Sequence, residues 1–598
     1  MTEAVAPAPS RSRRRVPRRR LVGLACAVWT AGAVAQSSSS SPSAPAVDAS
    51  SYNLHYDSIQ HPVIARKGMV VSQSDIASRI GADVLRDGGN AVDAAVAVGF
   101  ALAVTLPRAG NLGGSGFMLI HLARENRTVA LEYYSQAPAG IRAHMLLDAN
   151  GAVDESKRYS HLGAGVPGTV AGLYHAHQRY GKRAWKRLLQ PAIELAARGV
   201  MVTDDFAHAL NARKDRLARN SAAASTFFKR DLRSYAPTEK LVQSDLAWSL
   251  RQIARHGADA FYKGAIAGKI VADMQAQGGV MTREDLAAYA VKEQEPLWED
   301  YRGHRIALMP PPASGALLAQ LLNVIEQFPL SELGPNSVDS IHLMAEATKL
   351  VLIDRSAYFG GYPDYRVPAR GFTSDAYAQS LAAQISSARS RAPSALRPGD
   401  PYAYESRDTT HYSIMDSNGN VVSNTYTLGA SFGAHVVVAG AGFLLNDHIG
   451  NFALRAGAAG GGEMETSIAN ALAPGKRAIS TITPVIVFRN DRPYIVSGSP
   501  DGVRIITSVA QLLVNVIDHG LNIAEATARP RVFQSLIPGE LELEPGHPVD
   551  IARLLEQRGH RVRFVRNMGS TQSVLYENGL YFGAADTRRP DAAAAGVD

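Results

Sequence analysis

Apolar positions at residues 72–106 recur with helical spacing, and small alanines make up most of the face that would pack. This spacing predicts helical structure throughout the segment, with a face able to lie close against a sheet. A glycine loop at 110–116 follows and leads into 117–120, an apolar run that predicts a buried strand. Residues 165–350 keep a mostly helical pattern, interrupted at 309–312, because consecutive prolines cannot lie inside a helix.

After residue 408 the pattern changes to the two-residue alternation typical of strands. Residues 409–416 alternate, Asn418-Gly419 supplies a hairpin turn, and residues 421–428 return as a second strand. The sequence therefore predicts a mixed α/β protein with a sheet-rich C-terminal third and no internal repeat. Further predictions are strands at 442–445 and 484–488, a helix at 501–519, and a linker at 386–408 where Arg, Ser and Pro crowd together.

The composition is that of a folded globular protein. Of the 598 residues, 46% are hydrophobic, 19% charged and 7% aromatic, which excludes bulk disorder, collagen and a multi-span membrane protein. The length suits roughly four folding units or one large fused unit. The single cysteine, Cys26, excludes a disulfide framework and any site built from several thiolates.

The net charge of +8 is concentrated at the N-terminus. Residues 1–35 hold seven arginines and one acid, Glu3, which leaves +2 for the rest and predicts no nucleic-acid binding. Within them an Arg-rich start precedes an uncharged apolar stretch that ends in the small-x-small pattern Ala33-Val34-Ala35. We expect residues 1–35 to be a signal peptide, residues 36–52 a Ser-rich spacer, and the mature protein to be periplasmic or secreted.

Alternatives for this leader stay open. The apolar stretch is short for a bilayer about 30 Å thick, which disfavours a retained membrane helix and predicts no membrane span after leader removal. Arg13-Arg14 and Arg19-Arg20 match the twin-arginine export pattern loosely. A lipid anchor at Cys26 is disfavoured because few apolar residues precede it.

Metal and nucleotide motifs are absent from the sequence. Neither an H-E-x-x-H nor a P-loop pattern occurs. The glycine loop at 110–116 lacks the P-loop lysine and precedes a strand, so tight backbone packing is favoured over a phosphate site. No metal and no cofactor are expected.

Two threonines, Thr409 and Thr410, stand where an unstructured run ends and a predicted strand begins. Threonine is a good strand former, and on periodicity alone this plain structural role is favoured. The position at the end of an irregular run, with Ser, Thr and Gly downstream, raises the alternative of a threonine nucleophile.

Several motifs in fixed order decide between these alternatives. The motifs are Gly-Asn-Ala-Val-Asp-Ala-Ala at 89–95, Ala-Gly-Asn-Leu-Gly-Gly at 109–114, Gly-Val-Pro-Gly-Thr-Val-Ala-Gly at 165–172, Met-Pro-Pro-Pro-Ala-Ser-Gly at 309–315, His-Leu-Met-Ala-Glu-Ala at 342–347, Thr-Thr-His-Tyr-Ser at 409–413, Gly-Ser-Pro at 498–500 and Met-Gly-Ser-Thr-Gln-Ser at 568–573. Together they resemble the γ-glutamyltransferase (glutathione hydrolase) family of N-terminal nucleophile hydrolases, over nearly the whole mature chain.

The resemblance implies an α+β fold, a four-layer αββα sandwich of the N-terminal nucleophile hydrolase type. The precursor would cut itself between Asp408 and Thr409, giving a heavy chain of residues 53–408 and a light chain of residues 409–598 that fold jointly. The Thr409 hydroxyl would attack an amide, and its new α-amino group, with a reference pKa of about 7.7–8.0, would act as the base. Water or an amine would then resolve the acyl ester.

Supporting roles are also implied by the resemblance. Thr427 matches a second threonine that hydrogen-bonds to the nucleophile. The backbone N–H groups of Asp501 and Gly502 match the turn that holds the oxyanion, although the family has Gly at position 501. Ser480 and Thr481 match a pair that binds the donor's α-carboxylate.

The residues that would grip the amino-acid head of the donor depart from the family pattern. Tyr134, Gly429 and Asn451 replace an Arg, an Asn and an Asp, and His448 replaces a Gln. The stretch at the lid position, 454–469, lacks Tyr. Losing a charge-assisted partner costs about 2–5 kcal/mol, and a tyrosine cannot form a bidentate ion pair.

Three functions therefore stay open. The first is cleavage of γ-glutamyl amides such as glutathione, with transfer to water or to an amino-acid or peptide acceptor. The second is an acylase of the same mechanism that acts on glutaryl or cephalosporin-type amides. The third is an unprocessed scaffold without catalysis.

Overall fold

The computed structural model describes residues 58–361, 365, 367–401, 413–457 and 467–598. Its centre is a pair of seven-stranded antiparallel sheets. The first sheet has the order β1 (Val63–Ala65), β18 (Leu580–Ala585), β17 (Gln572–Glu577), β13 (Arg492–Ser497), β12 (Val485–Arg489), β9 (His304–Leu308) and β8 (Leu297–Tyr301).

The second sheet packs face to face on the first, with β2 against β17 and β18 and β11 against β13. Its order is β19 (Ala593–Val597), β2 (Gly68–Ser72), β10 (Ser413–Asp416), β11 (Val421–Thr427), β3 (Ser115–Leu122), β4 (Arg127–Tyr133) and β7 (Lys292–Gln294). Smaller sheets join β14 (Val532–Gln534), β15 (Glu540–Leu543) and β16 (Arg561–Phe564), and β5 (Val200–Met201) with β6 (Lys240–Leu241).

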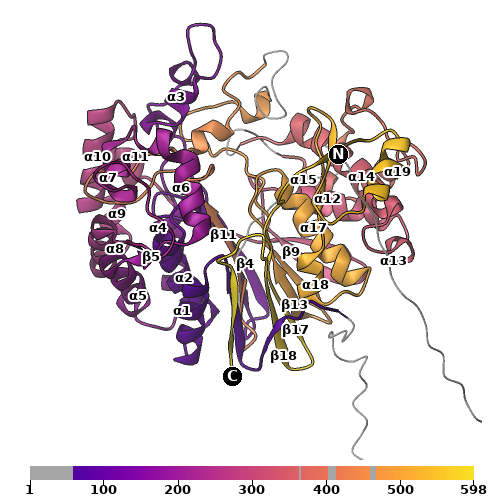
Figure 1. Ribbon diagram of the computed structural model, residues 1–598, viewed down its shortest axis with the longest axis horizontal. Coiled ribbons are helices and arrows are strands. Elements are labelled where there is room, and N and C mark those ends of the chain that lie inside the picture. The colour runs from indigo at the N-terminus through magenta and orange to yellow at the C-terminus, as the bar shows by residue number, and fades with distance from the viewer. Residues whose placement is uncertain (1–57, 362–364, 366, 402–412, 458–466) are drawn as a thin grey trace, which may run out of the picture. The chain divides into compact units, whose positions relative to one another are not determined.

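Helices cover the outer face of each sheet, which makes four layers (Figure 1). On the side of the second sheet lie α1 (Asp75–Arg86), α2 (Ala91–Thr105), α3 (Glu155–Arg158), α4 (Thr169–Tyr180), α5 (Trp185–Arg198), α6 (Asp204–Leu217), α7 (Ser221–Phe227), α8 (Ser244–His256), α9 (Asp259–Tyr262), α10 (Ala265–Gln277) and α11 (Arg283–Ala287). On the other side lie α12 (Gly315–Glu326), α13 (Leu330–Leu333), α14 (Val338–Tyr358), α15 (Ala369–Phe372), α16 (Asp375–Ala382), α17 (Arg504–Ile517), α18 (Ile523–Ala528) and α19 (Val549–Gln557).

Alternation along each strand divides the interior into two cores, because successive side chains point to opposite faces. On β3, Phe117 and Leu119 join the core that includes the space between the sheets. Met118 and Ile120 join the core under α2 and its neighbours. The predicted αββα sandwich is thus confirmed, and the apolar run at 117–120 is the buried strand that its pattern predicted.

Both sheets take strands from either side of position 408. In the second sheet, β10 lies between β2 and β11, so a strand that follows position 408 is flanked on one side by a strand that precedes it. In the first sheet, β12 pairs with β9 in the same way. The two segments therefore share both sheets and both cores.

The helical prediction at 72–106 is wrong in one respect. Two helices occur, separated at residues 87–90. Gly88 has φ +83°, and Asn90 begins α2 with a capping box in which Asp93 bonds back to the Asn90 N–H. The Gly-Gly-Asn sequence breaks the helix, while the apolar spacing on either side continues.

The predicted hairpin is confirmed where the structure describes it. Ser413 pairs with Ser423 across β10 and β11, and Gly419 takes φ +82° in the turn. The strand predicted at 484–488 and the helix at 501–519 appear as β12 and α17. Residues 165–350 are mostly helical as predicted, although the pattern did not reveal β7, β8 and β9.

The strand predicted at 442–445 is wrong. This segment makes only isolated bridges, Val437 with Leu444 and Gly113 with Leu445. Gly442 has φ +75°, outside the strand region, and the chain here wraps around the glycine loop instead of extending a sheet. An apolar run next to a glycine can be a buried irregular segment as well as a strand.

The predicted linker at 386–408 is described as far as residue 401. Its described part is bonded to the folded unit, since Ser390 N–H donates to the Arg558 carbonyl (2.7 Å) and Lys349 Nζ donates to Ser390 Oγ (2.7 Å).

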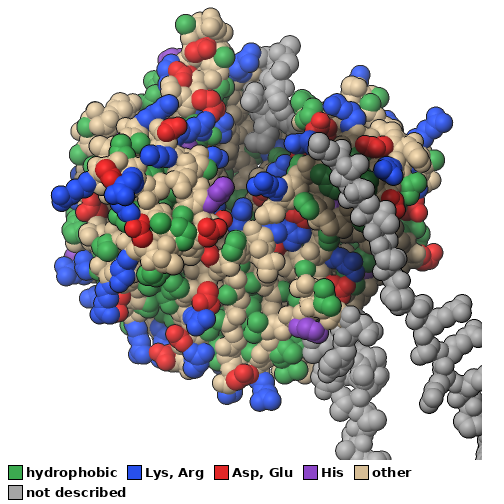
Figure 2. Space-filling model, in the orientation of Figure 1, with side chains coloured by type: hydrophobic (Ala, Val, Ile, Leu, Met, Phe, Trp, Pro, Cys, Tyr) green, Lys and Arg blue, Asp and Glu red, His purple; other side chains and the backbone are tan. Residues whose placement is uncertain are grey.

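On the face shown in Figure 2, basic side chains are interspersed with acidic ones. This agrees with the small charge left once residues 1–35 are set aside. Within the described residues, no helix is both long and apolar enough to cross a membrane. The predicted signal peptide and spacer lie outside the described residues.

Candidate active site

A cavity of about 500 Å³ opens where the end of β11 meets the turn before α17. Most of the predicted site residues contribute to its wall, although they come from segments far apart in the sequence. The predicted residues that line it are Tyr134, Thr427, Gly429, Asn451, Ser480, Thr481, Asp501 and Gly502. Asp408 and Thr409 lie outside the described residues.

Tyr134 follows β4 and is fully buried between two rings. Its ring stacks on Phe117 (centroids 5.0 Å apart) and on His448 (4.7 Å). Asn451 Nδ2 donates to the Tyr134 hydroxyl (2.8 Å), so two of the substituted head residues contact each other. Burial raises the pKa of Tyr134, partly offset by Ser480 and Asn451, and the phenol is therefore neutral. This wall offers hydrogen bonds and no charge.

His448 supports that wall from behind. It lies beside Tyr134, and its Nδ1 is 2.7 Å from Ser135 Oγ and 3.1 Å from Ser115 Oγ. Its Nε2 is buried and has no hydrogen-bond partner among the described residues. Burial lowers the pKa of His448 to about 3, so the imidazole is neutral at working pH. His448 thus positions Tyr134 and brings no cation to the cavity.

This burial predicts a pH dependence of stability. The unfolded chain protonates His448 below about pH 6.5, whereas the folded protein resists protonation down to a pKa of about 3. The free energy of unfolding should therefore fall as the pH falls, with a contribution from His448 of about 2–3 kcal/mol between pH 6.5 and 4. Denaturant unfolding of wild type and His448→Gln at both pH values checks this. The variant should lose less stability on acidification, and parallel losses would contradict the assignment.

Gly429 and Asp447 fit each other closely. Gly429 has φ +92°, and a Cβ there would lie 2.0 Å from Asp447 Oδ1. The same oxygen accepts the Ala430 N–H (2.8 Å), and Arg158 Nη2 lies 3.8 Å from Oδ2. Burial raises the pKa of Asp447, while the Ala430 N–H and Arg158 lower it. A carboxylate thus lies directly behind the cavity wall, where Gly429 has no side chain.

The predicted oxyanion turn has free donors. The backbone N–H groups of Asp501 and Gly502 donate to no acceptor in the described part of the chain. No atom lies near the position that a Cβ of Gly502 would take, so the space beside this turn is open. Two unpaired N–H groups at a cavity wall are suited to a developing negative charge.

The carboxylate of Asp501 does not occupy these donors. Its Oδ2 accepts the Gly569 N–H (3.1 Å) and lies 3.6 Å from Arg504 Nη1. Burial raises the pKa of Asp501, and the Gly569 N–H and the two arginines Arg504 and Arg589 lower it. The side chain is thus tied to neighbouring groups.

The glycine loop supports the end of β11. A Cβ at Gly113 would lie 2.1 Å from the Leu444 carbonyl oxygen, and one at Gly114 would lie 2.6 Å from that of Thr427. Such close approach leaves room only for glycine, as expected for tight backbone packing. On the cavity side, Thr427 Oγ1 accepts the Gly429 N–H (2.9 Å), which holds its hydroxyl at the end of the strand.

Two arginines in the wall were missed by the sequence reasoning. Arg108, just before the glycine loop, and Arg589, between β18 and β19, both line the cavity. Arg108 forms an ion pair with Asp205. Neither belongs to a motif, and nothing in the sequence distinguishes Arg589 from Arg588 beside it.

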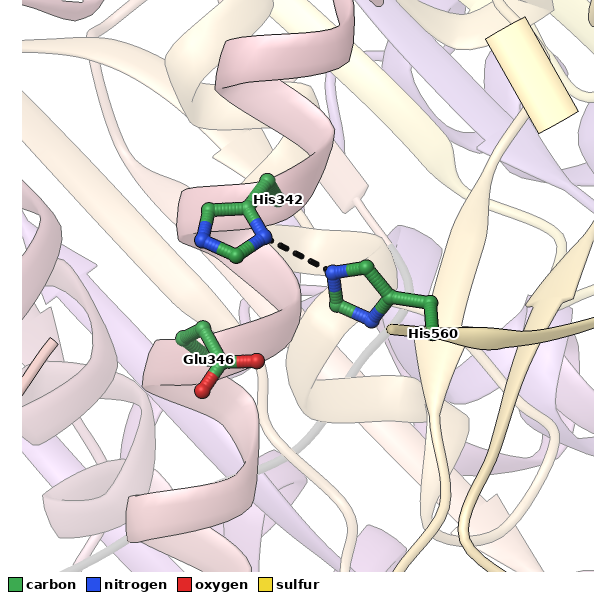
Figure 3. A group of neighbouring side chains, drawn as sticks. All are labelled: His342, Glu346 and His560. Atoms are coloured by element: carbon green, nitrogen blue, oxygen red, sulfur yellow. Dashed lines mark hydrogen bonds between the residues drawn. The ribbon is translucent and has the colours of Figure 1, made fainter. Parts of the chain in front are cut away.

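One group among the described residues has the atoms for a metal site. His342 and Glu346 lie one turn apart on α14 and face His560 (Figure 3). His342 Nδ1 and His560 Nε2 are hydrogen-bonded (2.8 Å), and Lys349 Nζ donates to Glu346 Oε1 (2.6 Å). The Lys349 ammonium group bonded to the Glu346 carboxylate would repel a metal cation. We therefore interpret this cluster as a polar network that anchors α14.

The four-layer αββα sandwich, in which the segments before and after position 408 share both sheets, is the fold of the N-terminal nucleophile hydrolases. Comparison with known proteins gives the family. A profile described as Gamma-glutamyltranspeptidase matches residues 77–596, and the chain belongs to this family of enzymes.

Relatives and structural neighbours agree with that assignment. The chain is 43% identical to a glutathione hydrolase proenzyme of Escherichia coli (strain K12), over 94% of this chain and 96% of the relative. It is 36% identical to an acylase ACY 1 proenzyme of Pseudomonas sp. (strain SE83), over 88% and 92%. A crystal structure of cephalosporin acylase from Bacillus halodurans superposes with a TM-score of 0.81 at 30% identity, covering 91% of this chain and 98% of the other.

Proposed function

We propose that this chain is an exported, self-processing γ-glutamyltransferase and glutathione hydrolase in which Thr409 is the nucleophile. The observation that carries the proposal is the cavity wall. It combines the backbone N–H groups of Asp501 and Gly502, which donate to no acceptor among the described residues, with Thr427 at the end of β11. No metal or cofactor is needed, since the hydroxyl, the amine and the backbone donors supply the chemistry.

The position of Thr427 supports its proposed role beside Thr409. Thr427 ends β11, the partner strand of β10, and lines the cavity. Thr427 Oγ1 already accepts one hydrogen bond and can donate its own proton to a neighbouring oxygen. We infer that it hydrogen-bonds to the Thr409 hydroxyl and orients it towards the substrate.

The reaction then follows in two steps. The Thr409 hydroxyl attacks the substrate amide carbonyl while the α-amino group, directly or through water, takes its proton. Charge that develops on the carbonyl oxygen is stabilised by the N–H groups of Asp501 and Gly502. The amine leaves with a proton, and water or an amine acceptor releases the acyl group from Thr409. Self-cleavage between Asp408 and Thr409 uses the same hydroxyl and frees the amine.

The donor head is assigned to the wall at Tyr134. Ser480 and Thr481 would bind the α-carboxylate, with Tyr134 adding a hydrogen bond. For the α-ammonium, Asn451 offers its side-chain oxygen, and the Asp447 carboxylate lies behind Gly429. This nearby carboxyl group supports a γ-glutamyl head, even though position 451 is an Asn in place of the family's Asp.

A second candidate is an acylase of the same mechanism. It is favoured by Tyr134 and Asn451, which contact each other and offer no charge to a zwitterion. The similarity to acylase proenzymes and to a cephalosporin acylase structure points the same way. Glutaryl or cephalosporin-type amides would then be the donors.

The two candidates differ in a single substrate group. γ-Glutamyl-p-nitroanilide and glutaryl-p-nitroanilide are identical except for the α-ammonium. We expect kcat/KM to favour the γ-glutamyl compound by at least about tenfold, the worth of one ion pair near the buried carboxyl group of Asp447. Initial rates at 410 nm give the ratio directly. A preference for the glutaryl compound would refute the first candidate in favour of the second.

A further inference from the structure

We propose that Arg589, next to Arg108, forms a binding subsite for a carboxylate carried by the amine half of the substrate. The assignment rests on the proposed amidase function, because that function divides the substrate into an acyl half and an amine half. The ligand class is an amine with its own carboxylate, such as an amino acid or the C-terminal part of a peptide.

Arg589 lines the cavity with an uncommitted guanidinium. It is half-buried, and its side chain makes no hydrogen bond or ion pair with any residue in the described ranges. Its neighbour Arg588 differs in this respect, with Nη2 2.5 Å from Glu544 Oε2 and Nη1 3.1 Å from Asp586 Oδ1. Arg588 therefore has a structural role, whereas Arg589 keeps its donors for a ligand.

Two guanidinium groups, those of Arg108 and Arg589, line the same cavity. Burial and the charge of Arg108 lower the pKa of Arg589, while the carboxylates of Asp205, Asp501 and Asp586 raise it. The one carboxylate paired with either guanidinium among the described residues is Asp205, which holds Arg108. The Nε of Arg108 is buried without an acceptor there. A bound carboxylate would relieve the repulsion between the two cations.

The position of the subsite assigns it to the amine half. The Tyr134 hydroxyl interacts with the side chains of both Asn451 and Ser480, and neither arginine acts on it. Asp501, in the oxyanion turn, does interact with Arg589. The reacting carbonyl lies at that turn, and the acyl chain extends to Tyr134. The leaving or accepting amine therefore faces Arg589.

A matched pair of substrates tests the subsite. γ-Glutamyl-p-nitroanilide and γ-glutamyl-3-carboxy-4-nitroanilide share the acyl half and differ by one carboxylate on the amine half. We expect the wild-type enzyme to favour the carboxylated anilide by about tenfold in kcat/KM, as for one charge-assisted contact. In Arg589→Gln this ratio should fall to near one, and Arg589→Lys should restore part of it. Arg492→Gln, an exposed arginine outside the cavity, is the control and should keep the wild-type ratio.

Product binding separates failure of this proposal from failure of the proposed function. Calorimetry should show 5-amino-2-nitrobenzoate binding to the processed enzyme about tenfold more tightly than 4-nitroaniline, with the difference lost in Arg589→Gln. If γ-glutamyl anilides are not turned over but this difference holds, the proposed function fails and the subsite stands. A ratio or a binding difference that survives Arg589→Gln would overturn the subsite.

Discussion

Thr409→Ala should yield a single uncleaved chain on a denaturing gel, where wild type gives two. Removing the hydroxyl removes the nucleophile for both self-cleavage and amide turnover, so activity should fall by at least about 10⁴-fold. The gel and the anilide rate are measured on the same preparations. Because β10 lies between β2 and β11 in the second sheet, the two wild-type chains should stay together in gel filtration without denaturant.

Thr409→Ser is the matched control, since it keeps a hydroxyl and should still process. A single full-length band for wild type under all conditions would instead favour the scaffold without catalysis. Wild-type cleavage elsewhere, with amide turnover intact, would refute the assignment of position 409. N-terminal sequencing of the light chain distinguishes these outcomes.

Gly429→Asn, which restores the residue of the family pattern, should destabilise the protein by about 3 kcal/mol. The added Cβ would lie 2.0 Å from Asp447 Oδ1, and the backbone there has φ +92°. Asp447 cannot move freely, because its Oδ1 holds the Ala430 N–H. Denaturant unfolding of the purified enzyme measures the loss, and the yield of processed chains reports the effect on folding in the cell.

Two variants separate the contact from backbone strain. Gly151 has φ +77° with open space around it, so Gly151→Asn should cost only about 1 kcal/mol. In a double-mutant cycle, Gly429→Asn with Asp447→Ala should be more stable than the sum of the single changes predicts. If the stability changes of the two substitutions are strictly additive, positions 429 and 447 do not approach each other as closely as the structure indicates.

Sequence reasoning found most of the site because the site residues lie within motifs. Asp501 and Gly502 follow the Gly-Ser-Pro motif, and Thr427 lies on a strand that its alternation predicted. It missed Arg589, because this arginine lies outside the motifs and nothing in the sequence distinguishes it from Arg588 beside it. It also gave the wrong structure at 442–445, where packing against the glycine loop outweighed a local apolar run.

The sequence by itself determined the family, many of the helices and strands, and the residue types available for chemistry, because motifs and periodicity are local properties of the chain. Only the tertiary structure decided which groups meet. It tied the Asp501 carboxylate to Gly569 N–H, made His448 a neutral support for Tyr134, and brought Asp447 behind Gly429. These outcomes depend on burial and on contacts between segments distant in sequence, and such contacts exist only after the sheets have packed.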